Sequence, residues 1–190
     1  MNSAVEWLET RTYVSRQWRA MYFGTIGAVA GFLGSLVMIA ADIVAAQAMG
    51  KSPFMMLRVY ATLTEGAGAL SLSNWTFFLS AFVMHLALGS ALGAIFALII
   101  SGRSRYQNAG HYLSAGVVFG LLIWIVNFYL LLSWIQPLIN GREYILSAIP
   151  WWVAAVTHAL YGLTVAAVCY PFRNDVSHEE PHRRTDIPIF

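Results

Sequence analysis

The sequence predicts an all-α membrane protein in which four transmembrane helices form an up-down-up-down bundle of two parallel-repeat hairpins. Three observations lead to this fold class. The 190 residues are 58% hydrophobic and only 11% charged, whereas about 25% of residues are charged in a soluble domain. Four apolar stretches are long enough to cross a bilayer, which takes about 20 residues each. One pattern of histidine and glycine occurs twice, at His85 and at His158.

The chain is expected to have three parts. Residues 1–21 carry a capping box, Ser3-Ala-Val-Glu6, and mix aromatic with charged side chains, which predicts a cytoplasmic N-terminal interfacial helix. Residues 22–170 form the bundle, and residues 171–190 form a cytoplasmic polar tail. The tail contains His178 and His182, but Pro181 breaks any helix that would place both on one face, so no metal site is expected.

The four spans follow from the apolar runs. The first is too long for a cleaved secretory signal and is expected to be retained. The third can extend to Ile135, just before Pro137. The predicted spans are Tyr22–Ala48, Trp75–Ser101, Tyr112–Leu132 and Ile145–Tyr170.

An insertion at residues 50–74 is expected to form a short outer helix. Ser52 followed by Pro53 is typical of a helix start, with serine as the N-cap and proline at the first position. The next turns are apolar nearly all round, and Gly66 and Gly68 end them. Such a helix lies in the membrane interface or covers the top of the bundle. The alternative is an irregular loop in contact with lipid.

The two halves of the bundle resemble each other. Helices one and three carry a Gly-x3-Gly pattern, and helices two and four carry the histidine pattern. Equivalent positions differ by 89 residues from Gly27 to Gly116 and by 73 from His85 to His158, so the outer insertion accounts for 16 residues. Small residues at every fourth position allow helices to approach closely. The predicted helix-packing residues are Gly27, Gly31, Gly89, Gly93, Gly116, Gly120, Gly162 and Ala166.

The charges predict the orientation and limit the partners. Eight of the 11 lysines and arginines fall on the side of the two termini, which places both termini in the cytoplasm. A net charge of +2 with no basic stripe argues against a nucleic-acid partner. The single Cys169 excludes an internal disulfide and a cysteine-based metal cluster. The expected partners are the lipid bilayer and a larger membrane-protein complex or a second copy of the chain.

Four segments of the chain resemble one family. The resemblance covers Gly24 to Tyr170 and is to the YagU-like small proteins of the bacterial inner membrane. It implies a multi-pass four-helix protein of the bacterial inner (cytoplasmic) membrane, and it supplies no catalytic residues. The matching segments are Gly24-Thr-Ile-Gly27, His85-Leu-Ala-Leu-Gly89, Gly116 to Trp124, and Pro150 together with His158-Ala-Leu-Tyr-Gly162.

His85 and His158 are the first candidates for chemistry. An ionisable side chain inside a bilayer is a functional-site hypothesis by default. Helices two and four would be diagonal in the bundle, so the two imidazoles could hold a b-type haem as axial ligands. The competing reading, which we favour, is that each histidine donates a hydrogen bond across a helix contact, because no arginine or lysine lies in position for both haem propionates. The favoured expectation is therefore that no cofactor is bound. Haem b is the alternative, and proton transfer or quinone contact is a third reading.

Asp42 and Asn127 are the other polar candidates within the spans. Asp42 could relay protons or pair with Arg58 or Lys51, but a carboxylate near a helix end that reaches the interface is expected. Asn127 is expected to make an interhelical hydrogen bond rather than to bind a substrate.

No catalytic motif is present, so we do not expect an enzyme. The first hypothesis is a non-catalytic integral membrane subunit that packs against a larger membrane complex, respiratory or energy-converting, and stabilises it or helps it assemble. One alternative is a small haem-b electron-transfer protein that uses His85 and His158. Another is a small transporter or proton-conducting protein, although helices one, two and four lack the breaks that transporters show.

Overall fold

The structure is a computed structural model that describes residues 16–71 and 75–175, and within these ranges it is helical without strands. Four helical segments are long and apolar enough to cross a membrane, which indicates a multi-pass membrane protein and confirms the predicted all-helical class. They are α2 (Arg16–Ala48), α4 (Trp75–Ile100), the continuous run of α5 (Ala109–Ile125), π-helical η3 (Val126–Leu132) and α6 (Ser133–Asn140), and α8 (Trp151–Cys169).

The remaining elements are short. They are α3 (Met55–Glu65), η1 (Gly66–Leu70), η2 (Ser104–Tyr106), α7 (Ile145–Ala148) and η4 (Tyr170–Phe172). The predicted N-terminal interfacial helix lies outside the described residues, except that residues 16–21 continue α2. The predicted tail lies outside them after residue 175.

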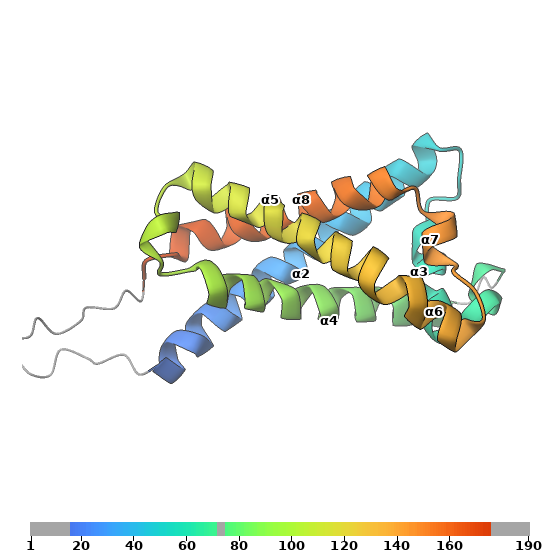
Figure 1. Cartoon of the computed structure of the whole chain (residues 1–190), viewed down its shortest axis with the longest axis horizontal. Coiled ribbons are helices and arrows are strands. Elements are labelled where there is room, and N and C mark those ends of the chain that lie inside the picture. Colours follow the sequence, from blue (N-terminus) through green and yellow to red (C-terminus); the bar gives the residue numbers. More distant parts are fainter. Residues whose placement is uncertain (1–15, 72–74, 176–190) are drawn as a thin grey trace, which may run out of the picture.

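The long helices form an arc rather than a closed square. Consecutive long helices run in opposite directions, and the described part of the chain starts and ends at the same end of the molecule (Figure 1). Helix α2 packs against α4 and α8, and α8 also packs against α5, whereas α4 and α5 meet only slightly. Their contact includes Phe96 on Tyr112 and Phe119, and a 2.9 Å hydrogen bond between the hydroxyls of Ser101 and Tyr112. The spatial order is therefore α4, α2, α8, α5.

Glycines hold α2 close to α4. A Cβ added at Gly31 would overlap the carbonyl of Gly89, and one at Gly27 would overlap the carbonyl of Gly93. Such backbone proximity is what small residues at every fourth position allow in membranes. The four glycines predicted for the first two spans, Gly27, Gly31, Gly89 and Gly93, therefore lie at one helix–helix contact.

The contact between α5 and α8 is built in the same way. A Cβ at Gly116 would overlap Gly162 and the side chain of Ala166, and one at Gly120 would overlap the carbonyl of His158. This contact fixes the backbone of His158 against α5. Gly34 of α2 was not among the predicted packing residues, and it lies against the ring of Tyr161 from α8.

Two predicted helix ends are wrong, and each involves proline. The third span does not stop before Pro137 but continues to Asn140, where Gly141 adopts a left-handed φ of 74°. The π-helical turns of η3 precede this proline and loosen the hydrogen-bond ladder there. The fourth span begins at Trp151 rather than Ile145, because Ile149 is extended before Pro150 and separates α7 from α8.

The outer helix α3 is present, as predicted, and covers one end of the bundle. It begins after Phe54 rather than at Pro53, and it ends at Gly66, whose φ is 59°. Its buried Met56 and Val59 pack in a cluster with Phe128, Ile145, Ile149 and Val153. The insertion is therefore a packed cap and not an irregular lipid-contacting loop.

A buried amide joins α3 to the second half of the chain. Gln136 is fully buried, and its Nε2 donates to Thr62 Oγ1 at 2.8 Å. Its Oε1 accepts the backbone N–H groups of Tyr144 and Ile145, both at 2.9 Å. Because all these groups are paired, the cap is held in one position.

Candidate functional site

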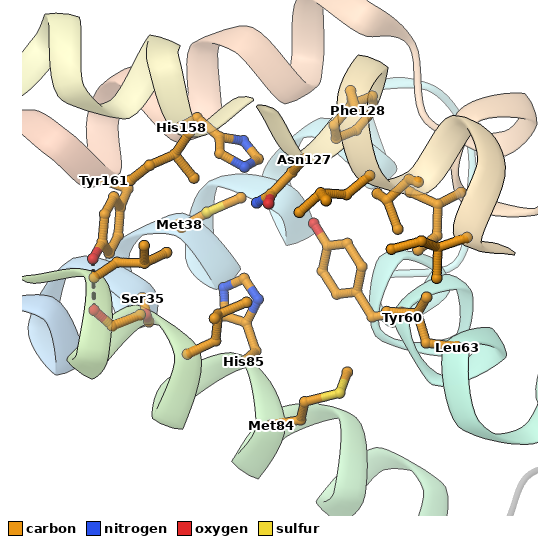
Figure 2. A pocket seen from close by; sticks show the side chains of 18 residues that line it. Ser35, Met38, Tyr60, Leu63, Met84, His85, Asn127, Phe128, His158 and Tyr161 are labelled. Atoms are coloured by element: carbon orange, nitrogen blue, oxygen red, sulfur yellow. Dashed lines mark hydrogen bonds between the residues drawn. The ribbon is translucent and has the colours of Figure 1, made fainter. Parts of the chain in front are cut away.

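The open side of the arc contains a cavity of about 280 Å³ (Figure 2). Leu88 of α4 and Leu131 of η3 line the cavity and are also 53% and 38% exposed, so the cavity opens sideways between these two elements. Most of its lining is apolar, and no charged side chain of the described residues lines it. Its polar lining residues are Ser35, Tyr60, His85, Asn127, His158 and Tyr161.

His85 and His158 face this same cavity. Figure 2 shows the two imidazoles pointing toward each other from α4 and α8. Helices α4 and α8 make only a small contact with each other, and both pack against α2. The structure thus brings together the two residues that the repeated pattern singled out.

The ring of His85 is held by a stacking contact. The ring of Tyr60 from α3 lies nearly parallel to it, with centroids 5.3 Å apart and an interplanar angle of 13°. His85 Nε2 is buried and has no hydrogen-bond partner among the described residues. His85 Nε2 therefore does not make the predicted hydrogen bond across a helix contact, and it stays available to another molecule.

His158 is oriented by its own helix. Its Nδ1–H donates to the carbonyl of Ala154, one turn earlier, at 2.7 Å. The edge of the Phe128 ring approaches it, with centroids 6.1 Å apart and an angle of 89°. Because a carbonyl only accepts hydrogen bonds, Nδ1 carries the proton and a neutral ring keeps its lone pair on Nε2. The predicted interhelical bond is replaced by one within α8.

Asp42 is covered by protein, whereas the sequence-based expectation was a carboxylate that reaches the interface. Its side chain is 2% exposed, and its Oδ2 accepts a 2.8 Å hydrogen bond from the hydroxyl of Tyr60. Thr157 of α8 also faces the carboxylate. The cap formed by α3 explains the difference, since it covers the end of α2 that the sequence leaves open. No described residue forms an ion pair with Asp42.

Asn127 also differs from expectation. It lies in η3 and its amide points into the cavity (Figure 2), where no described residue hydrogen-bonds it. The widened π-helical turn places this amide at the cavity instead of at a helix–helix contact. Ser35 Oγ, on α2, is likewise buried without a partner.

Two tyrosines complete the site and were missed by sequence reasoning. In the sequence, Tyr60 is one of several apolar residues of the short outer helix, and Tyr161 lies between His158 and Gly162 of the second histidine pattern. Neither position indicates a contact with the cavity. The hydroxyl of Tyr161 donates to the carbonyl of Gly89 at 2.6 Å, so it links α8 to α4 behind the cavity. This hydrogen bond and the stacking of Tyr60 on His85 join residues far apart in the sequence, so no local sequence pattern predicts them.

Among the described residues, no group of three His, Cys, Asp or Glu side chains is placed to hold a metal ion. A comparison with protein-family models found no match, and searches of curated proteins and of solved structures found no similar chain.

Proposed function

We propose that this chain is a non-catalytic membrane subunit that holds a lipid-soluble molecule in the central cavity. The observation that carries the proposal is the unpaired Nε2 of His85, buried beside an apolar cavity that opens sideways. An unpaired polar group in hydrocarbon costs several kcal/mol. A ligand that hydrogen-bonds it recovers much of that cost.

The lining defines the chemistry of the ligand. No charged side chain of the described part lines the cavity, which favours an uncharged head group. Tyr60 and Phe128 supply aromatic walls, while His85, Asn127 and His158 supply hydrogen bonds. A single flat ring with carbonyl or hydroxyl oxygens, such as a quinone, matches these groups. Its apolar tail would leave the cavity between Leu88 and Leu131.

Such a subunit would serve a larger complex. We propose that it packs against a respiratory or energy-converting membrane complex and stabilises it or helps it assemble, since lipid-soluble carriers move between such complexes. Eight of the 11 lysines and arginines lie on the side of the two termini, Arg103 and Arg105 of the middle loop included, which supports cytoplasmic ends. The bacterial inner membrane follows from the family resemblance. The resemblance to YagU-like proteins stays a prediction.

Neighbouring residues of η3 provide a matched test of ligand binding. Leu131 lines the cavity, whereas Leu130 is exposed and does not. Leu131→Trp should fill the cavity mouth and lower the amount of a co-purifying ring amphiphile at least tenfold, while Leu130→Trp should leave it unchanged. The ligand is measured by solvent extraction of the purified protein and mass spectrometry. Equal ligand content in the two variants, or no such molecule in the wild type, would contradict the proposal.

The placement of the two histidines favours haem b as a second candidate. His158 has the orientation that metal-binding histidines show, with Nδ1 donating to a carbonyl and Nε2 free. The cavity of about 280 Å³ lies below the usual ligand-pocket range of about 300–1,000 Å³, and it suits a single ring better than a macrocycle. A Soret band in the purified protein that disappears in His85→Ala would establish haem, and its absence would eliminate it.

A further inference from the structure

A second apolar groove, of about 650 Å³, lies on the outside of α2, α3 and α4. It shares no lining residue with the central cavity. Leu79 and Trp75, which line it, are 62% and 79% exposed, so the groove faces the surroundings of the bundle. Its lining residues are Ile39, Ile43, Phe54, Leu57, Arg58, Trp75, Phe78, Leu79 and Phe82.

Arg58 is the charged residue of this lining. Its guanidinium lies over the ring of Phe78, 5.5 Å from the centroid. Its Nε is buried without a hydrogen-bond partner, and no acidic side chain of the described residues forms an ion pair with it. The groove therefore contains a positive charge that nothing in the described structure neutralises.

Arg58 lies over Phe78, the residue at which the apolar span of α4 begins. Arg58 belongs to α3, which follows the first span and caps the bundle, so it is expected at the level of the lipid head groups. The apolar lining runs along α4 from Trp75 to Phe82, a distance of about 10 Å at 1.5 Å per residue. An exposed tryptophan such as Trp75 of this lining is typical of the membrane interface.

We propose that this groove binds an anionic phospholipid. The guanidinium of Arg58 receives the phosphate, for which arginine offers two parallel N–H donors. One acyl chain lies along Ile39, Ile43 and Leu79. Charge complementarity selects the anionic lipid over a zwitterionic one, because the phosphate in the latter is already paired with its own cation. This site is independent of the ligand proposed for the central cavity.

Native mass spectrometry of the full chain tests this lipid site. The protein in detergent is offered phosphatidylglycerol or phosphatidylcholine with identical acyl chains. We expect about fivefold more retained phosphatidylglycerol, the effect of one basic residue at a membrane surface. Arg58→Gln should abolish this preference. Arg142→Gln is the matched control, since Arg142 also lies over an aromatic ring, that of Tyr144 at 5.4 Å, in the loop after α6.

Two further variants test the groove itself. Leu79→Trp fills the groove without changing its charge and should lower retention of phosphatidylglycerol, whereas Val83→Trp, exposed one turn later and outside the lining, should not. If circular dichroism shows that Arg58→Gln fails to fold, Leu79→Trp and Val83→Trp still test the proposal. Equal preference in Arg58→Gln and Arg142→Gln, or unchanged retention in Leu79→Trp, would overturn the proposal.

Discussion

Tyr60 connects the cap to two polar residues of the bundle. Its hydroxyl donates to Asp42, and its ring stacks on His85. Burial raises the pKa of Tyr60 well above its usual value of 10, and the nearby charge of Asp42 raises it further. The phenol therefore stays protonated and keeps its hydrogen bond at any physiological pH.

Tyr60→Phe should destabilise the folded protein by about 1–3 kcal/mol, because it leaves the buried carboxylate of Asp42 without this donor. Thermal unfolding in detergent measures the effect. Tyr129→Phe is the control, since Tyr129 is exposed and its hydroxyl has no hydrogen-bond partner among the described residues. Equal melting temperatures for the two variants would contradict the role assigned to Tyr60.

The same tyrosine predicts a pH dependence. Its pKa is higher in the folded than in the unfolded state, so the stabilisation that it provides is complete below pH 10. Above pH 10 the unfolded chain releases the proton first, and the stabilisation falls. The difference in melting temperature between wild type and Tyr60→Phe should therefore shrink from pH 9 to pH 11.

At the scale of helices, backbone contacts between glycines set the position of both histidines. His85 lies one turn before Gly89, which meets Gly31, and the carbonyl of His158 meets Gly120. Both imidazoles thus extend from helices whose backbones are in direct contact with a neighbour. Such contacts tolerate no side chain between them.

Gly31→Ala should cost about 1–3 kcal/mol of stability, because the added Cβ would force α2 and α4 apart. Gly24 provides a control on the same helix, since a Cβ there meets nothing within 4 Å. Gly24→Ala should be neutral or stabilising by up to about 1 kcal/mol, as alanine favours helix over glycine. Denaturation of the two variants in detergent measures the difference, and a similar loss in both would be inconsistent with close packing at Gly31.

At the scale of the whole molecule, the cap couples the two halves of the chain. Helix α3 belongs to the first half, yet Thr62 is bound by Gln136 and its carbonyl by Asn140 Nδ2 at 2.9 Å. Gln136 also holds the start of α7. The position of Tyr60 at the cavity therefore depends on contacts with the second half.

Gln136→Ala should loosen this cap, since it leaves the buried N–H of Ile145 without its acceptor. We expect faster amide hydrogen exchange in Met55–Glu65 and around Ile145, with the spans unchanged. Gln47→Ala, at an exposed position, is the control. Unchanged exchange in α3 would show that apolar packing alone holds the cap.

Much of the fold and part of the site could be predicted from the sequence. The apolar runs located four spans, and glycine spacing located the close contacts, because both are local patterns. The third helix end at Pro137 could not be predicted, since the π-helical turns before it depend on packing. The partners of Asp42 and Asn127 also depend on segments distant in sequence.

The sequence by itself determined that the chain is an apolar helical protein with two histidines in similar sequence patterns, since helix length and periodicity depend on nearby residues alone. Only the tertiary structure decided that the helices form an open arc, that α3 covers Asp42, and that both imidazoles share one cavity. These features arise from how the long helices pack and from what caps them. Packing depends on contacts between segments throughout the chain, so it cannot be predicted from any one segment alone.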